Sequence, residues 1–394
     1  IPQLSSERIL AAPKHVATAL RRWGGEDWLF LLNLSETEPT EGDVVLCSAL
    51  CGHYAEEWDM VSFEPRGARS LSGLRFEAGE MRIFRLSREQ LPAAAEPEGE
   101  QIALPDKMDY ELSEPNVLVL DRAKCFVDGQ LQFGGEAKEV LRLDRALRER
   151  FGLAYRGGEM VQPWFAEKYG KKETKFFGKV RLIYEFYSDI ECEAELAAEY
   201  ENVSCNGIKA EQTSKRWVDC CYHVYRIDVC QGRNEIAMEI EYGASSNIEA
   251  VFLLGMFGVS PTALKIVSLP DKLATDEIGA QGFPFYSGAI RYKTGISCGR
   301  IKIKLENLHA VSLHAGSGKN EKMIAFPPYL GYTETGDELI LTVYFTRRNT
   351  FGPFHLRNQP AESYGPFSFV SEGNDWTDDY VRIPQGFACK IYKI

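Results

Sequence analysis

Six aromatic or polar residues stand in Gly- and Pro-rich segments and have the types that a sugar-binding surface uses: Trp164, Tyr286, Tyr329, Asn349, His355 and Trp376. The C–H faces of a sugar ring stack on Trp and Tyr, whereas its hydroxyl groups need partners such as Asn, Asp, Arg or His. We therefore predict these six as ligand-binding residues. The alternative is that the aromatic side chains only cap the ends of a β-sandwich.

Catalysis on a sugar would need a second kind of pattern, two carboxyl groups held about 5 to 10 Å apart across the scissile bond. The densest acidic clusters are residues 56–59 (Glu-Glu-Trp-Asp) and residues 375–379 (Asp-Trp-Thr-Asp-Asp). In a chain with a formal net charge of −12, such clusters are usually solvated surface. The catalytic residues are therefore unknown at this stage.

Metal and thiol chemistry find little support in the spacing of the cysteines and histidines. The ten cysteines include no C-x-x-C pair, and the six histidines form no H-x-x-x-H or H-E-x-x-H pair. We predict no metal and no cofactor. Cysteines spread through strand-like segments favour buried thiols in a reducing compartment, so we expect a cytoplasmic protein. Secretion stays open, because the chain begins with Ile1 rather than Met.

Composition limits the fold and the partners. The chain has 394 residues, 44% of them hydrophobic and 12% aromatic, with 45 Lys and Arg against 57 Asp and Glu. Nucleic acid is an unsuitable partner for so acidic a chain, and no apolar run approaches the roughly 20 residues that cross a bilayer. Abundant aromatic residues and 34 glycines favour strands joined by turns. We predict an all-β fold.

The order of strand-like runs predicts two domains joined by a linker. Residues 1–90 contain short alternating apolar runs typical of a small antiparallel β-sandwich. Residues 91–106 are rich in Pro, Ala and Glu and are predicted to be a linker that proteases prefer. Residues 107–394 return to strand patterns and are predicted to form a larger jelly-roll β-sandwich. One helical insertion is expected near residues 138–151.

A succession of turn and core residues then suggests a family. Residues 203–207 (VSCNG), Trp217 and Asp219, residues 227–229 (IDV) and residues 232–236 (GRNEI) follow one another in that order. This succession resembles the sugar-binding jelly-roll domain of family-2 glycoside hydrolases and related galactose-binding-like domains. In that family, such a domain supports the catalytic barrel or contacts distal sugar units and supplies no catalytic carboxylate.

Three further stretches, residues 283–288, 326–329 and 348–355, resemble the later part of large bacterial glycosidase-like proteins. The last of them reads RNTFGPFH where those proteins often have RNLLGPHH. Residues 9–86 are similar to the small β-domain that follows a catalytic barrel in many glycosidases. The resemblance implies a barrel that lies N-terminal to this chain and is absent from it.

Three functions compete. The leading hypothesis is an ancillary carbohydrate-binding or scaffold region of a glycoside hydrolase, with an oligosaccharide or glycoside and the catalytic domain of the same polypeptide as partners. The first alternative is that the large β-sandwich is itself a glycosidase that acts through an Asp/Glu pair. The second alternative is a protein–protein adhesion module, because fold alone does not decide function.

Overall fold

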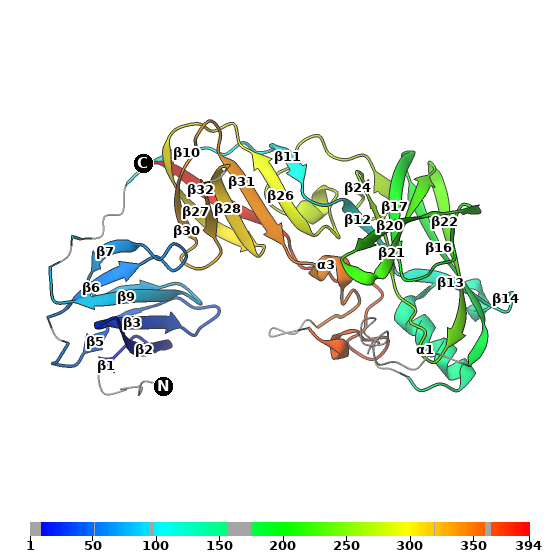
Figure 1. Cartoon of the computed structure of the whole chain (residues 1–394), viewed down its shortest axis with the longest axis horizontal. Coiled ribbons are helices and arrows are strands. Elements are labelled where there is room, and N and C mark those ends of the chain that lie inside the picture. Colours follow the sequence, from blue (N-terminus) through cyan, green and yellow to red (C-terminus); the bar gives the residue numbers. More distant parts are fainter. Residues whose placement is uncertain are drawn as a thin grey trace.

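The computed structural model describes residues 9–50, 52–90, 92–93, 98–155, 175–318, 320–358 and 364–394. They form an all-β protein, which confirms the predicted fold class. The strands pair almost entirely antiparallel and build three units (Figure 1). The unit that contains the C-terminal strand lies between the other two in space (Figure 1). After the first unit, the chain contributes strands to this middle unit, continues into the last unit, and then returns to the middle one.

The first unit ends at Ser87 and is a small antiparallel sandwich. Leu29 and Leu31 are fully buried and belong to one core with Phe84. Gly24 and Gly25 both have positive φ angles, which allows the tight turn of its first hairpin. Its main sheet has the order β2 (Val16–Trp23), β3 (Glu26–Asn33), β9 (Met81–Ser87), β6 (Tyr54–Trp58), β7 (Pro65–Arg69), and two strand pairs join β1 (Ile9–Ala11) to β5 (Val45–Leu46) and β4 (Thr40–Gly42) to β8 (Leu74–Phe76).

The second unit is a sandwich whose two sheets enclose a core that includes Leu182, Tyr184 and Leu196. Asn206 and Gly207 have positive φ angles and form the tight hairpin turn that the sequence predicted. One sheet has the order β12 (Asn116–Leu120), β23 (Val251–Gly255), β17 (Cys192–Ala198), β21 (Asp219–Val229), β20 (Glu211–Trp217). The other has the order β14 (Gln130–Leu131), β13 (Arg122–Val127), β16 (Phe176–Ser188), β22 (Gly232–Gly243), β18 (Val203–Cys205), β19 (Ile208–Lys209), with β15 (Lys138–Glu139), β24 (Gly258–Val259) and β25 (Ile266–Val267) beside it.

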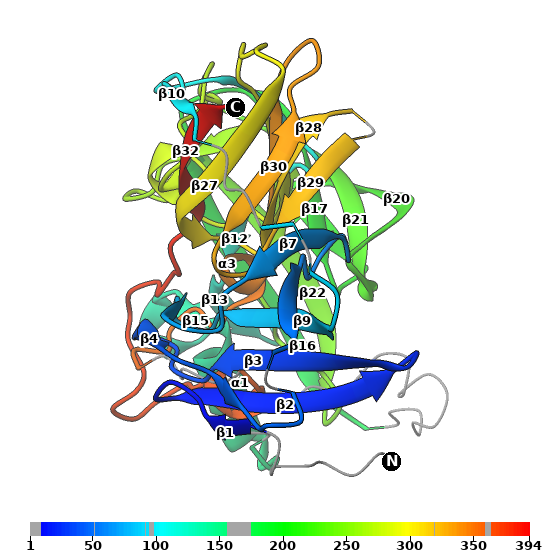
Figure 2. The same ribbon diagram turned by 90° about the vertical axis from the view of Figure 1, so that its left-hand side faces the viewer.

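The third unit is another sandwich with its own core, which includes Tyr286, Ile303 and Leu341. One sheet has the order β10 (Glu100–Ile102), β32 (Gly386–Lys393), β27 (Arg300–His309), β30 (Leu330–Glu334). The other has the order β11 (Asp109–Leu112), β26 (Gly288–Lys293), β31 (Ile340–Phe345), β28 (Ser312–Ser317), β29 (Asn320–Ile324). Figure 2 shows the first unit below these strands. The two units are in contact, because Lys322 of β29 lies 3.5 Å from the carboxylate of Asp59 in the first unit.

The division of the chain after the first unit differs from the predicted one. The sequence predicts a single jelly-roll over residues 107–394, whereas the structure separates two hydrophobic cores there. Residues 91–106, predicted as linker, include strand β10, which pairs with the C-terminal strand β32. Alternation of apolar and polar residues shows that a segment is a strand, but it does not show which of two sheets the strand joins.

Helix α1 (Val140–Phe151) confirms the predicted helical insertion and is the longest helix of the described residues. Glu139 caps its first turn, and Gly152 ends it in the left-handed conformation with φ 66°. The one-turn helix α3 (Arg348–Phe351) is shorter, and neither α-helix could span a membrane. Short 3-10 turns are η2 (Phe133–Gly135), η3 (Ile278–Gln281) and η4 (Pro366–Ser368).

A long connection between β31 and β32, which we call the crossover segment (the described part of residues 346–385), ties the second and third units together. It leaves the third unit through α3, passes beneath the second unit, and returns as β32 (Figure 1). Phe351, Phe354 and Tyr380 of this segment pack against the core of the second unit. Segments far apart in the sequence therefore meet at one edge of that sandwich.

Candidate functional site

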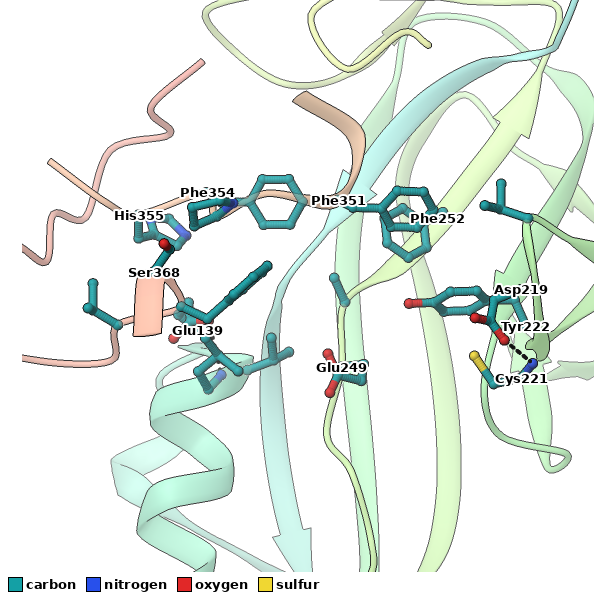
Figure 3. A pocket seen from close by; sticks show the side chains of 17 residues that line it. Glu139, Asp219, Cys221, Tyr222, Glu249, Phe252, Phe351, Phe354, His355 and Ser368 are labelled. Carbon is teal, nitrogen blue, oxygen red and sulfur yellow. Dashed lines mark hydrogen bonds between the residues drawn. The ribbon is translucent and has the colours of Figure 1, made fainter. Parts of the chain in front are cut away.

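A cavity of about 310 Å³ opens where the crossover segment meets the start of α1 and the turn between β20 and β21 (Figure 3). A larger groove of about 840 Å³ lies over the hairpin of β18 and β19, but its described lining contains no aromatic ring. The smaller cavity combines apolar walls with a few polar groups, which is the usual composition of a small-molecule site. Its chemically informative lining consists of Glu139, Asp219, Tyr222, Glu249, Phe252, Phe351, Phe354, His355 and Ser368.

Aromatic rings form one wall of the cavity. The ring centroids of Tyr222 and Phe252 are 5.4 Å apart, and those of Phe252 and Phe351 are 5.3 Å apart. Trp217 packs against Phe252 from the side, with centroids 4.9 Å apart, and is itself half-buried at the edge of the core. Because these rings hold one another in place, the apolar wall exists without a ligand.

Carboxylates gather at the same end of the cavity as Tyr222. Burial raises the pKa of the Tyr222 phenol, and the nearby carboxylates of Glu249, Glu199 and Asp219 raise it further. The same pattern of burial followed by neighbouring carboxylates raises the pKa of the Cys221 thiol. Both groups are therefore neutral hydrogen-bond donors at pH 7, in surroundings of negative charge.

The opposite end of the cavity contains a buried histidine. Nε2 of His355 lies 2.7 Å from Oδ2 of Asp121, and the hydroxyl of Tyr380 donates to the other oxygen of the same carboxylate. Burial by itself lowers the pKa of His355, but the hydrogen bond and charge of Asp121 outweigh it, so the pKa is raised. The imidazole is thereby fixed in one orientation with Nε2 turned away from the cavity.

Glu139 stands between the histidine and the helix. Its two carboxylate oxygens accept hydrogen bonds from the backbone N–H groups of Leu141 and Arg142, each at 3.0 Å. Burial raises the pKa of Glu139, and the neighbouring Asp121 adds to that shift. Because both oxygens cap the N-terminus of α1, this carboxylate stabilises the helix as well as lining the cavity.

Two buried nitrogen atoms near this end have no hydrogen-bond partner among the described residues: Nδ1 of His355 and Nε1 of Trp376. The two rings are neighbours, with centroids 6.1 Å apart, and the guanidinium of Arg142 covers Trp376 at 4.3 Å. His355 is only 5% exposed. Both nitrogens lie below the surface of the described residues, and Trp376 is not part of the cavity lining.

The structure brings His355 and Trp376 together but places Tyr286 and Asn349 away from the cavity lining. Tyr286 is fully buried in the third unit, where its hydroxyl donates to the carbonyl of Ala289 at 2.8 Å. Asn349 is buried and hydrogen-bonds to Ile383 within the crossover segment. These two side chains hold the fold together and do not face the cavity, contrary to the exposure expected from their Gly- and Pro-rich surroundings.

Tyr329 and Trp164 are the remaining two predicted ligand-binding residues. Tyr329 is half-exposed and packs at the edge of the core of the third unit, away from the cavity lining. Trp164 lies outside the described residues. The assignment of the six residues to ligand binding stays a prediction, now centred on His355 and Trp376.

The acidic clusters noted in the sequence also acquire clear positions. Glu56 and Glu57 are buried and form ion pairs with arginines of the first unit, among them Arg85 and Arg82. Asp378 pairs with Arg122 on the surface. Glu56 and Glu57 are therefore buried and paired, whereas solvated surface was expected for this run. None of these carboxylates lines the cavity.

Most of the cavity residues were not identified from the sequence. Asp219 and Phe351 stood within quoted motifs but were treated as turn and core residues, and Glu249 and Phe252 follow no recognisable spacing. They converge only because the crossover segment returns to the second unit. A long loop with a Pro- and aromatic-rich sequence was the one available signal.

Metal and thiol chemistry remain without support in the part of the chain that the structure describes. No group of three or more His, Cys, Asp and Glu residues there has an arrangement suited to a metal ion. The cysteines it describes, such as Cys125 and Cys221, are free thiols, and burial raises the pKa of both. Raised pKa values make these thiols poor nucleophiles.

Comparison with known proteins yields only distant likeness, and only to solved structures. Neither the protein-family profiles nor the curated proteins gave a match. Among solved structures, a rhamnosidase from Novosphingobium sp. PP1Y is similar over 60% of this chain and 24% of its own, at 12% sequence identity and a TM-score of 0.15. The matched part is thus less than a quarter of the rhamnosidase, and so low a likeness says nothing about what this chain does.

Proposed function

We propose that this chain is an ancillary, carbohydrate-binding region of a glycoside hydrolase, and that the cavity of the second unit is where it binds sugar. The observation that carries the proposal is the composition of that cavity. An aromatic wall of Tyr222, Phe252 and Phe351 shares the cavity with polar side chains that include Asp219 and His355. Aromatic faces next to fixed polar groups suit the alternating C–H and O–H surfaces of a sugar.

The experiment is a calorimetric titration of the chain with mono- and oligosaccharides. Saturable binding is expected, and Phe351→Ala should weaken it roughly tenfold through loss of one stacking face. The matched control is Trp23→Ala, because Trp23 is 76% exposed in the first unit and far from the cavity lining in sequence and structure. Asp219→Asn provides a second test, since Asp219 is exposed and its replacement leaves the core intact.

Two results would reject the proposal. One is the absence of saturable binding to any sugar of a panel that covers neutral, acidic and amino sugars. The other is equal affinity of Phe351→Ala and Trp23→Ala, with both variants folded by circular dichroism, because the aromatic wall would then play no part.

A glycosidase remains the second candidate, because three carboxylates line one cavity and one of them, Glu139, has a raised pKa as a general acid requires. Against it, both oxygens of Glu139 already accept backbone hydrogen bonds. We therefore expect no turnover of aryl glycosides or oligosaccharides by this chain. Turnover that Glu249→Gln or Asp219→Asn abolishes would replace the ancillary role with a catalytic one.

A further inference from the structure

The crossover segment closes one side of the cavity in the second unit. Phe351, Phe354 and His355 belong to this segment and line the cavity, and Figure 3 shows them along one side of it. Tyr222 of β21 and Phe252 of β23 contribute to the same lining from the second unit itself. The cavity therefore keeps its shape only while the segment is docked on this unit.

The two arms of the crossover segment, residues 353–358 and residues 375–381, are tied to each other. Leu356 and Trp376 form an antiparallel bridge between the arms. Backbone hydrogen bonds join them further, from Arg357 to Asp375 at 2.7 Å, from Thr377 to His355 at 3.0 Å and from Val381 to Phe354 at 2.7 Å. Because these bonds lie within the segment, the arms can leave the second unit together without breaking them.

One buried carboxylate of the second unit holds both arms. Asp121 lies between β12 and β13, and its side chain is fully buried. Its Oδ2 lies 2.7 Å from Nε2 of His355 on the first arm, and its Oδ1 accepts a hydrogen bond from the hydroxyl of Tyr380 on the second arm. The next residue, Arg122, donates to the carboxylate of Asp378 at 3.0 Å and to its carbonyl at 2.6 Å. Two adjacent residues thus fasten both arms to the second unit.

Other polar contacts of the segment are of a different kind. Arg145 of α1 pairs with Glu372 at 2.7 Å, but both side chains are exposed, and exposed ion pairs contribute little to stability. Arg382 reaches the carbonyl of Pro261 at 3.2 Å. Neither contact joins both arms to one buried charge, as Asp121 does. Removal of one partner from a buried pair is costly, so the contacts of Asp121 should decide whether the arms stay docked.

We infer that Asp121 is a lock for the crossover segment, and that release of this lock lets the two arms leave the second unit together and opens the cavity. The segment acts as a strap over the cavity. The inference concerns the conformation of the chain and holds for any occupant of the cavity, so it does not depend on the proposed sugar binding.

His355 makes this lock sensitive to pH. Burial lowers the pKa of the imidazole, but the hydrogen bond and the charge of Asp121 outweigh burial and raise it. The other titratable or charged groups around the imidazole are Glu139 of β15, which adds to the rise, Arg122 of β13, which opposes it, Tyr380, whose phenol pKa is raised by burial, and Arg142 of α1, whose guanidinium lies over the neighbouring Trp376.

The docked and the released segment therefore bind the proton of His355 with different affinity. In the released segment the imidazole returns to its ordinary pKa of about 6.5, whereas the pKa of the docked imidazole is higher. Docking is favoured most below about pH 6.5 and weakens as the pH rises through the value of the docked state. We expect the strap to open more often in alkaline than in weakly acidic solution.

The test is amide hydrogen exchange of the chain without added ligand, expressed as protection relative to the intrinsic exchange rate at each pH. Asp121→Asn should lower the protection of the two arms roughly tenfold and leave strands β16 and β31 unchanged. The matched control is Asp144→Asn. Asp144 is also a buried carboxylate of the second unit, but it accepts from Tyr242 and Arg148, each at 2.8 Å, and neither donor belongs to the segment. This variant should leave the protection of both arms unchanged.

A second measurement uses the unmodified chain. From about pH 6 to about pH 9, the protection of both arms should fall severalfold in the wild type and stay level in His355→Gln. The lock is overturned if the arms lose protection only together with β16, or if Asp144→Asn loosens them as much as Asp121→Asn does. Protection of the wild-type arms that does not change with pH overturns the role of His355. Because no sugar is added, failure of sugar binding leaves each of these outcomes as it is.

Discussion

Buried carboxylates occur in two regions of this molecule with opposite surroundings. In the first unit, Glu57 accepts from Arg82 at 2.8 Å and from Arg69 at 3.0 Å. At the cavity, Glu139 lies among backbone N–H groups and beside His355, and no arginine neutralises it within the described lining. The same residue type thus serves as part of an ion-pair network in one place and as part of a ligand-sized opening in the other.

The difference shows which carboxylates are informative about function. A carboxylate surrounded by arginines has its charge and hydrogen bonds satisfied inside the protein, so nothing further has to bind it. Glu139 has its hydrogen bonds satisfied by the backbone of α1, but no arginine pairs with its charge within the described cavity lining. The dense acidic run at residues 56–59 belongs to the first kind, although it is the more conspicuous one in the sequence.

The largest effect on stability is expected from Glu57→Ala. The substitution removes the carboxylate that Glu57 shares between Arg82 and Arg69, and the Arg82 side chain is nearly buried, so the free energy of unfolding of the first unit should fall by about 3 to 5 kcal/mol. Urea denaturation measures this loss. Sugar affinity of the folded variant should not change, and a matching loss of affinity would erase the distinction between the two regions.

A smaller loss is expected from Trp217→Ala, which removes support from the aromatic wall. Trp217 is half-buried and contacts Phe252 and Phe351, so the second unit should lose about 2 to 3 kcal/mol, below the cost for a fully buried Trp. Sugar affinity should fall in the same variant, because the two rings it supports line the cavity. An unchanged melting temperature would contradict the packing role of Trp217.

Much of the architecture was predictable from sequence because it depends on local pattern. The Asn206-Gly207 hairpin and the helix that ends at Gly152 follow from residues that tolerate or require positive φ. The all-β class follows from alternation. The separation into a second and a third unit does not, since β10 and β32 lie almost 300 residues apart in the chain and pair in space.

The candidate site was predictable only in part, because its residues also come together from segments that are distant in the sequence. His355 and Trp376 were selected because their types suit sugar contact, and they do lie together. Tyr286 and Asn349 were selected on the same ground, yet Tyr286 is fully buried and Asn349 nearly so. Residue type and a Gly- or Pro-rich neighbourhood do not distinguish a loop that lies on the surface from one that passes between two sandwiches.

The pair of His355 and Asp121 predicts a dependence of stability on pH. The pKa of His355 is raised in the folded protein, so the folded state binds its proton more tightly than the unfolded state does. Its contribution is therefore fully present below the unfolded value of about 6.5 and is lost as pH rises through the folded value. In denaturation between pH 5.5 and 9, His355→Gln should remove this loss above about pH 6.5.

The control for that measurement concerns Glu139, whose pKa is also raised. Its effect has the same sign but begins near its unfolded value of about 4.3, below the onset for the histidine. A difference curve between the wild type and His355→Gln that is flat from pH 5.5 to 9 would show that the histidine is not coupled to Asp121.

The smallest effect is expected where an acid of the first unit meets the third unit. Lys322 lies 3.5 Å from Asp59, but Asp59 already accepts from the backbone N–H groups of Val61 and Ser62 at 2.8 Å and pairs with Arg66 at 2.6 Å. The carboxylate is thus satisfied without the lysine, and Lys322→Ala should cost no more than about 0.5 kcal/mol. Asp59→Ala should cost more, because it also removes the support of the turn and leaves Arg66 unpaired.

Differential scanning calorimetry of both variants tests this order. If Lys322→Ala lowered the free energy of unfolding as much as Asp59→Ala does, Lys322 of the third unit, rather than Arg66, would be the main partner of this carboxylate. The carboxylates of the first unit would then not be satisfied within that unit alone.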